Sequence, residues 1–405
     1  MSSITPEEQL HIIQSGTDTI VPQDLLLEKL KRGTALNIKL GVDPTAPDIH
    51  LGHAVPLRKL RQFQDLGHHV TLIIGDGTAL IGDPSGRNST RPQLTREQIA
   101  VNAQTYVDQA FKILDPEKTT LRYNSEWILD LKMEDLLKLI SNFTVARILE
   151  RDDFHKRYTG GLPIALHEFL YPVMQAYDSV VIKADVEIGG SDQLFNLLAG
   201  RELMEKMGME PQVALTLPLL EGTDGVRKMS KSYGNYIGLT DEPNDMFGKV
   251  MNIPDELMVK YYRLASTESV AKIDEIEAGL AADELHPNKV KRALARNIVA
   301  AYYDEAAAEA AEADFDLKFK AHGFPADAPV FDADLTAGED GMVYFAKVIV
   351  DAGAAQSVSA ARRLIDEGAV RVNGEALAAK SYNLAPESLK GAEVQVGKKK
   401  FFKLA

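Results

Sequence analysis

LNIKLGVDPTAPDIHLGHAVPLRKLRQFQDL, residues 36–66, is the stretch that decides the fold. Its first part, Leu36–Val42, is short, rich in branched residues and mostly apolar, as strands of a buried parallel sheet are. Its last part, Gly52–Leu66, predicts a helix that stops before Gly67, because glycine commonly ends helices. Apolar side chains recur three apart along that helix: Leu57, Leu60 and Phe63. The stretch therefore predicts a strand, a loop and a helix in succession.

Further segments of the same kind follow, with helical patterns between them. They predict strands at Val70–Gly75, Thr119–Tyr123, Val180–Ala184 and Val213–Leu217. Strands that alternate with helices indicate an α/β fold with a doubly wound parallel sheet of the Rossmann type. Ligands of such sheets bind beyond the carboxyl ends of the strands, where the strand order reverses.

Changes of pattern divide the chain into parts. Residues 35–220 carry the strand–helix alternation and place a first domain at residues 1–240, and residues 241–321 read as a helical domain. Residues 322–340 are rich in Pro, Ala and Asp and predict a linker. The last part, residues 341–405, predicts a small α+β domain.

Short-range patterns support the two later domains. Apolar residues recur every fourth position in the helical part: Val290, Leu294, Ile298 and Tyr302. In the last part, Ser357–Glu367 predicts a helix, and Asn373-Gly374 after Ala369–Val372 predicts a hairpin with a tight primed turn.

Composition and charge exclude several classes of protein. The chain of 405 residues has no cysteine, so disulfides, thiolate zinc sites and a cysteine nucleophile are excluded. The apolar runs are too short to span a bilayer, and MSSITPEEQL lacks the pattern of a signal peptide, so no membrane association and a cytoplasmic location are expected. The net charge of −14 argues against a protein that coats nucleic acid. Residues 341–405 nevertheless carry ten Lys and Arg against six Asp and Glu, which makes RNA contact there a local possibility.

The first motif that carries chemistry runs from Gly41 to His53. It follows a predicted strand and opens a helix, where free backbone N–H groups and the helix dipole attract anions. His50 and His53 can donate ring N–H bonds to phosphate oxygens, and Gly52 leaves room for a base or ribose against the backbone. The alternative is an ordinary capped helix with two surface histidines.

The second motif is Lys228-Met229-Ser230-Lys231-Ser232, in a loop bounded by Gly225 and Gly234. Two lysines three apart on a glycine-flanked loop can close over a triphosphate and meet the charge that develops on pyrophosphate. A solvated basic turn is the alternative for this motif alone. Both motifs together, at the ends of one sheet, resemble the "HIGH" and "KMSKS" elements of the class I aminoacyl-tRNA synthetases.

The segments between the motifs resemble the tyrosyl branch of that family. They are Ile81–Gly86, Tyr171–Asp178 and the turn Gly189–Gln193. The resemblance implies a Rossmann-type catalytic domain, a helical anticodon-binding domain and an S4-like RNA-binding domain. It also implies a homodimer that activates L-tyrosine with ATP and transfers it to tRNA(Tyr). ATP is expected to enter with Mg²⁺ that phosphates and water hold, so no protein metal ligand is predicted.

Site residues follow from the resemblance, position by position. Around tyrosine, Asp83, Tyr171 and Gln175 would hold the α-ammonium group. Asp178 would accept the phenol hydroxyl with Asn124 nearby, and Gln193 would contact the carboxyl group. Around ATP, Gly41, Asp43 and Gly52 would line the adenylate site, and Asp192 would bind the ribose. The residues expected to act on the phosphates as the catalytic set are Thr45, His50, His53, Lys228 and Lys231.

The chain departs from the family pattern at three positions. Lys39 stands where some members have a second tyrosine that contacts the phenol hydroxyl. Glu187 replaces a glutamine before the Gly-Gly turn, and Leu194 replaces an aromatic residue. Lys39 is therefore included among the candidate tyrosine-binding residues.

The carboxyl-terminal part resembles the S4 module. Arg362 and Arg363 on the predicted helix could meet RNA phosphates, and Lys398, Lys399 and Lys400 add charge beside two phenylalanines. A purely structural basic domain is the alternative. For the whole chain, two other functions stay open: a synthetase for tryptophan, and an RNA-binding relative without catalysis.

Overall fold

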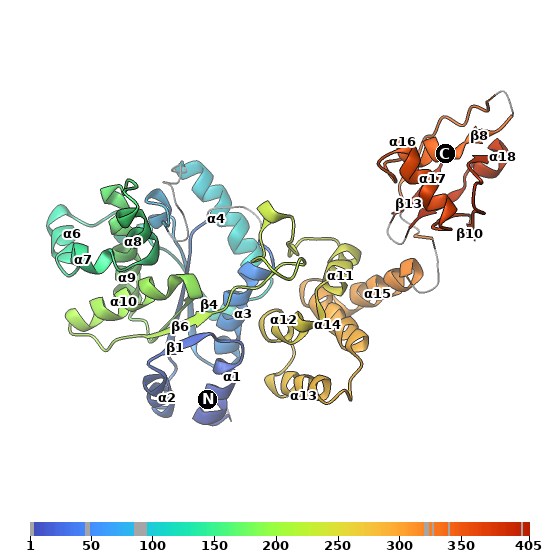
Figure 1. Ribbon diagram of the computed structural model, residues 1–405. Helices are drawn as coiled ribbons and strands as arrows, with labels where there is room; N and C mark the ends of the chain where they lie inside the picture. The colour runs from blue at the N-terminus through green and yellow to red at the C-terminus, as the bar shows by residue number, and fades with distance from the viewer. Residues whose placement is uncertain are drawn as a thin grey trace. The chain divides into compact units, whose positions relative to one another are not determined.

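The computed structural model describes residues 4–44, 49–84, 95–319, 324–325, 328–338, 341–397 and 400–405. The chain forms two compact units, Met1–Asp304 and Glu305–Ala405 (Figure 1). In the described residues no helix is long and apolar enough to cross a bilayer.

The first unit is built on a six-stranded sheet with the order β1-β6-β5-β2-β3-β4. Strands β2 to β6 run parallel, and the short edge strand β1 pairs antiparallel with β6. Strand order reverses at β2, which pairs with β3 on one side and β5 on the other. The strands are β1 (Thr19–Val21), β2 (Asn37–Val42), β3 (His69–Ile74), β4 (Thr119–Tyr123), β5 (Val186–Gly190) and β6 (Val213–Leu217).

Helices cover this sheet on both sides (Figure 1). The helices of this part of the chain are α1 (Pro6–Gln14), α2 (Gln23–Lys31), α3 (Leu51–Asp65), α4 (Arg96–Ala110), α5 (Ser125–Ile128), α6 (Met133–Ile140), α7 (Val145–Ile148), α8 (Asp152–Thr159), α9 (Leu170–Ile182) and α10 (Leu194–Lys206). Of these, α6, α7 and α8 form a group to one side of the sheet, where α6 packs on α9 (Figure 1). Leu57, Leu60 and Phe63 of α3 are fully buried, so the apolar repeat in the sequence marks the face that α3 turns to the core. Gly67 follows that helix with a φ of +90°, as its predicted role requires.

Four of the five predicted strands are confirmed, and the one at Val180–Ala184 is wrong. Those residues end helix α9, which Lys183 terminates in the left-handed conformation with a φ of 52°. The branched residues there look like a strand, but they continue the apolar face of a helix that also buries Val173 and Met174. The true strand is β5, whose buried Glu187 and glycine pair conceal it in the sequence.

Helices continue after the sheet, as predicted. They are α11 (Pro243–Met251), α12 (Met258–Ala265), α13 (Val270–Ala281) and α14 (Pro287–Tyr302). Helix α15 (Glu305–Phe319) falls in the second compact unit. The domain boundaries near 240, 321 and 340 stay predictions.

The second unit holds a small sheet with the order β10-β9-β12-β13-β7 and a two-stranded one of β8 and β11. Its elements are β7 (Val330–Phe331), β8 (Val343–Tyr344), α16 (Phe345–Asp351), α17 (Val358–Asp366), β9 (Val370–Val372), β10 (Glu375–Ala376), β11 (Asn383–Leu384), α18 (Pro386–Leu389), β12 (Glu393–Val396) and β13 (Lys400–Leu404). The predicted hairpin is confirmed, with a φ of 51° at Asn373 and 85° at Gly374, as a primed turn needs. Ser357 caps α17 through a hydrogen bond from Ala360 N to its Oγ.

Candidate active site

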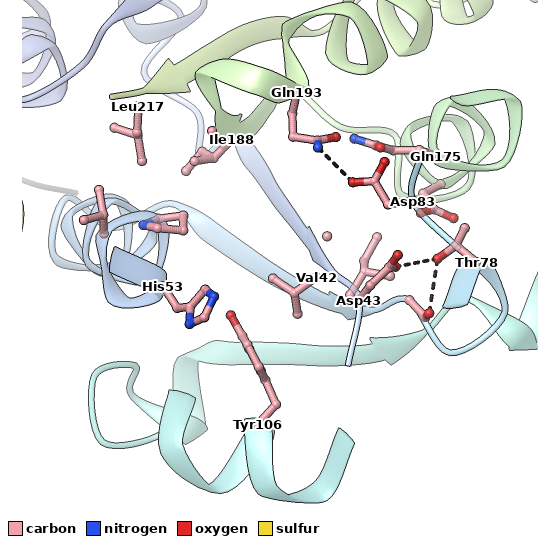
Figure 2. Close-up of a pocket in the computed structure, with 18 of the residues that line it drawn as sticks. Val42, Asp43, His53, Thr78, Asp83, Tyr106, Gln175, Ile188, Gln193 and Leu217 are labelled. Carbon is pink, nitrogen blue, oxygen red and sulfur yellow. Dashed lines mark hydrogen bonds between the residues drawn. The ribbon is translucent and has the colours of Figure 1, made fainter. Parts of the chain in front are cut away.

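A cavity of about 330 Å³ opens at the carboxyl ends of β2, β3, β5 and β6, where the strand order reverses (Figure 2). It gathers residues from the loops after these strands and from helices α3 and α9. Ten of the residues predicted for the site line it: Gly41, Asp43, Gly52, His53, Asp83, Asn124, Tyr171, Gln175, Asp178 and Gln193. Positions far apart in the chain thus meet where an α/β sheet binds its ligands.

Asp43 directly follows β2 and is the first of three carboxyl groups at the cavity. Its Oδ1 accepts a hydrogen bond from Thr78 Oγ1 at 2.8 Å, and its Oδ2 accepts one from the Tyr171 hydroxyl at 2.9 Å. Desolvation and the nearby Asp83 carboxylate raise the pKa of Asp43 to about 7. Desolvation and the Asp43 carboxylate raise the pKa of Tyr171 well above its usual value, so Tyr171 stays a neutral donor at physiological pH.

Asp178 on α9 is the second carboxyl group, and it is almost fully buried. Its Oδ1 accepts from Trp127 Nε1 at 2.8 Å, and its Oδ2 accepts from Asn124 Nδ2 at 3.3 Å. Burial raises the pKa of Asp178 to about 6, while the nearby Lys39 ammonium lowers it. Each carboxylate oxygen keeps a second lone pair that can accept a further hydrogen bond. Sequence reasoning missed Trp127; as the one tryptophan in the chain, it was a signal that could have been used.

Asp83 is the third carboxyl group and is held from two sides. Gln193 Nε2 donates to its Oδ2 at 3.1 Å (Figure 2). Arg151 Nη2 donates to its Oδ1 at 3.1 Å. Asn196 Nδ2 in turn donates to Gln193 Oε1 at 2.7 Å. These contacts fix the carboxylate and the carboxamide relative to each other. Nothing in the sequence around Arg151 marked it for this place.

Lys39 is fully buried but does not line the cavity. Its ammonium donates to Gln175 O at 3.0 Å and to Ser179 Oγ at 2.8 Å, and it lies 2.9 Å from Glu187 Oε1. An ammonium has three N–H donors, and these three acceptors use them all. The structure therefore gives no support to the predicted contact between Lys39 and the phenol hydroxyl, because the lysine has no donor left for it.

His50 and His53 stack on each other at the start of α3, with ring centroids 3.8 Å apart. His53 is exposed and lines the cavity, and its Nδ1 accepts from His50 N at 3.5 Å, whereas His50 is buried and so is no ordinary surface histidine. Desolvation, the His53 ring and the Lys231 charge together lower the pKa of His50 to about 3, and desolvation and the Lys231 charge lower that of His53 to about 4. Both rings are neutral at physiological pH, so each keeps one N–H to donate.

The loop of the second motif is anchored at both ends. Met229 is buried and its N donates to Leu220 O at 2.8 Å, and Ser230 N donates to Asn235 Oδ1 at 2.9 Å. Gly234 takes a φ of +66°, which a residue with a side chain would adopt with strain. Lys231 is exposed at the apex, with its Nζ 5.7 Å from the centre of the Tyr236 ring.

The two motifs join through the backbone. Leu51 N donates to Ile237 O at 2.9 Å, and Leu239 N donates to Ile49 O at 3.1 Å. Burial and the Asp83 carboxylate raise the pKa of Asp192, and the Lys228 charge opposes them. The backbone bonds therefore tie the first motif to the segment that follows the lysine loop, and neither Lys228 nor Lys231 lines the cavity.

The remaining predicted residues lie elsewhere or beyond the described part. Arg362 and Arg363 border an open hollow on α17, and the Arg362 guanidinium lies 4.3 Å from the Tyr382 ring centre. Lys400 Nζ donates to Gly353 O at 2.8 Å. Thr45, Ser85, Gly86, Lys398 and Lys399 lie outside the described residues. Within the described residues, no group of three or more His, Asp or Glu side chains is arranged to hold a metal ion.

Two family models match the chain. That of the tRNA synthetases class I (W and Y) covers residues 31–320, and that of the S4 domain covers residues 345–389. Among curated relatives, a tyrosine–tRNA ligase of Desulfotalea psychrophila is 49% identical over 402 residues, which is 98% of each chain. A tyrosine–tRNA ligase of Aquifex aeolicus is 50% identical over 401 residues, covering 99% of each chain.

Solved structures share the fold at lower identity. The C-terminally truncated mitochondrial tyrosyl-tRNA synthetase of Aspergillus nidulans has a TM-score of 0.64 at 23% identity, over 78% of this chain and 94% of that one. The tyrosyl-tRNA synthetase of Archaeoglobus fulgidus complexed with L-tyrosine has a TM-score of 0.62 at 23% identity, over 75% of this chain and 99% of that one.

Proposed function

Because the chain belongs to the class I tRNA synthetase family, and to its tyrosine–tRNA ligase branch, we propose that its cavity joins L-tyrosine to ATP and that its second unit holds tRNA(Tyr). The reaction of that branch has two steps. Tyrosyl-adenylate and pyrophosphate form first, and tyrosine then passes to the 3′ end of tRNA. The observation that supports the residue assignment is that Asp178, Asp83 and the first motif segment line one cavity.

Asp178 selects the amino acid. Trp127 donates to one of its carboxylate oxygens and Asn124 donates to the other. Each oxygen keeps a second lone pair, which can accept from the phenol hydroxyl of tyrosine. A buried carboxylate left without that donor loses free energy, so phenylalanine is rejected. At the other end of the substrate, Asp83, Tyr171 and Gln175 hold the ammonium group, and Gln193 meets the carboxyl group.

The first step needs no general base, since the carboxylate of the substrate tyrosine is already a nucleophile. It attacks the α-phosphorus of ATP, and pyrophosphate leaves with the bonding electrons. Gly41, Asp43 and Gly52 line the nucleotide end, and Asp192 binds the ribose. Neutral His50 and His53 donate to phosphate oxygens with Thr45, and Lys228 and Lys231 move over the leaving group, whose charge grows in the transition state.

Mg²⁺ enters with ATP in this proposal. We expect phosphates and water to coordinate the ion, because Mg²⁺ usually keeps several waters and binds substrate phosphates. It would neutralise phosphate charge while the protein positions the reacting atoms.

The reaction takes place in the cytoplasm.

The second unit binds the tRNA. Arg362 and Arg363 are exposed on α17, where guanidinium groups can meet backbone phosphates, and Lys400 lies in the neighbouring strand β13. The basic charge of residues 341–405, against the acidic remainder, supports this division of work.

We assign the homodimer contact to an apolar face of the first unit. Helices α6, α7 and α8 lie together (Figure 1). These helices and the residues after them expose large apolar side chains. Their exposed fractions reach 69% at Met133, 62% at Val145 and 84% at Leu166. A second copy of the chain would cover this surface, as contiguous exposed apolar patches commonly mark interfaces.

Pyrophosphate exchange with each amino acid in turn tests the function. Exchange that depends on tyrosine supports it, and exchange that depends on tryptophan would show the other branch. A chain that exchanges with neither amino acid yet binds tRNA would be the relative without catalysis.

A further inference from the structure

A buried ion pair lies directly behind the cavity, on two neighbouring strands of the sheet. Lys39 on β2 and Glu187 on β5 are opposite each other in the strand register, and their side chains are 0% and 1% exposed. The Lys39 Nζ–Glu187 Oε1 distance is 2.9 Å. Burying two charges is costly, and their attraction offsets that cost only when further hydrogen bonds satisfy both groups.

Those further bonds are present, and they lead to the cavity wall. Ser179 Oγ donates to Glu187 Oε2 at 3.1 Å, and the amide of the fully buried Gln212 donates to the same oxygen. Gln175 Nε2 donates to Glu187 Oε1 at 3.1 Å. Of these three donors, only Gln175 lines the cavity. Through the donors to Glu187, the ion pair therefore reaches the cavity by the Gln175 side chain, while the charges of Lys39 and Glu187 act in opposite directions on the pKa of Asp178.

An ionised carboxylate constrains the amide that faces it. Glu187 with its charge balanced by Lys39 can only accept hydrogen bonds, so Gln175 must turn its NH₂ group toward it. The carbonyl oxygen Oε1 is then the polar atom of Gln175 that remains for a ligand. No residue among those described donates a hydrogen bond to it, although Gln175 lies at the cavity.

We propose that Lys39 and Glu187 are positioning residues for the α-ammonium group of the amino-acid substrate. The pair fixes the Gln175 carboxamide with its oxygen toward the cavity, where a cation needs an acceptor. Without the pair, the amide is free to rotate and present its NH₂ group, which repels an ammonium. This rests on the proposed activation of tyrosine, and it gives Lys39 a role through Gln175 in place of a contact with the phenol.

The test compares two ligands that differ only at the ammonium group. They are L-tyrosine and 3-(4-hydroxyphenyl)propanoate, and calorimetry gives the Kd of each. In the variant Lys39→Met with Glu187→Gln, both charges go together, so no buried charge is left uncompensated. We expect the Kd for tyrosine to rise about tenfold, the scale of one hydrogen bond to a charged group, and the Kd for the propanoate to change less than twofold.

Rescue and control variants separate positioning from structure. Adding Gln175→Glu to that variant supplies a carboxylate that accepts in either orientation, so the tyrosine Kd should recover. The matched control removes another buried pair, Arg157 with Glu168, whose side chains are 2% and 5% exposed and do not line the cavity. Arg157→Met with Glu168→Gln should leave the ratio of the two Kd values unchanged.

Two results would overturn the proposal: equal weakening of both ligands, or no recovery with Gln175→Glu. If the variant without the ion pair does not fold, a second double variant, Gln175→Glu with Glu187→Gln, keeps Lys39 and the net charge of the protein. The Kd of this double variant for tyrosine should lie within about threefold of the Kd of the unchanged protein. A larger rise in Kd that tyrosine and the propanoate share would contradict the proposal. Failure of the unchanged protein to bind tyrosine at all would instead refute the proposed function.

Discussion

Replacing Asp178 by alanine should weaken the use of tyrosine far more than the use of phenylalanine. The variant removes the acceptor for the phenol hydroxyl, and a hydrogen bond to a charged group contributes about 1.5–3 kcal/mol. At about 1.4 kcal/mol per factor of ten, kcat/KM for tyrosine should fall roughly 10- to 150-fold. Phenylalanine offers no hydroxyl, so its kcat/KM should change only through the cavity that the shorter side chain leaves.

The assay is pyrophosphate exchange with each amino acid on the same preparation. Phenylalanine serves as the internal control, because damage to the fold lowers both rates together. A parallel loss for the two amino acids would mean that Asp178 supports Trp127 and Asn124 without touching the substrate, and the proposed selection would be wrong.

The pH dependence gives a second measurement on the unchanged protein. The pKa of Asp178 is about 6, so the carboxyl group is ionised above that value and protonated below it. As the pH falls through about 6, kcat/KM for tyrosine should fall relative to kcat/KM for phenylalanine. The ratio isolates Asp178, because protonation of Asp43, with a pKa of about 7, affects both amino acids.

Three further predictions concern the loop, the histidines and the second unit. Lys231→Met should lower kcat for adenylate formation roughly tenfold or more and leave the KM for tyrosine unchanged, since its charge acts on the leaving group; an unchanged kcat would exclude the loop from catalysis. His50 binds a proton more weakly in the folded state, with a pKa of about 3 against 6.5, so stability should fall as pH drops from about 6.5 toward 3. In His50→Gln the urea midpoint should depend less on pH over that window; an equal dependence would assign it to other groups. A chain ending at Ala337 should form tyrosyl-adenylate at nearly the full rate but lose tRNA charging. For each lost phosphate contact, the slope of log binding constant against log salt concentration for tRNA should become flatter by roughly 0.7–0.9. Loss of pyrophosphate exchange would mean that the residues after Ala337 are part of the catalytic fold.

Local pattern was enough to predict most of the sheet. Thr119–Tyr123 and Val213–Leu217 are strands with the predicted bounds, because branched, apolar runs between turns match buried parallel strands. The same rule failed at Val180–Ala184, where branched residues belong to a helix buried on its apolar face. Period and composition do not distinguish these cases over five residues, and tertiary packing decides.

The site was less accessible to sequence reasoning than the fold. The motifs led to residues such as His53 and Asp178, which the cavity brings together. Trp127 and Arg151 act through contacts with residues dozens of positions away, and no local pattern encodes such contacts. Lys39 is the clearest case. The sequence marked its position as unusual, but the direction of its side chain depends on the ion pair with Glu187. Glu187 lies on β5, a strand that was not predicted from the sequence.

The backbone bonds between the two motifs also set an order of assembly during synthesis. Chains grow from the amino terminus, and domains fold as they emerge from the ribosome. Every side chain assigned to tyrosine has been made once Gln193 is added, and β6 completes the sheet at Leu217. The start of α3 lacks its partners until Ile237 and Leu239 follow. A nascent chain thus completes its amino-acid end first, and its nucleotide end waits for the segment that carries the lysines.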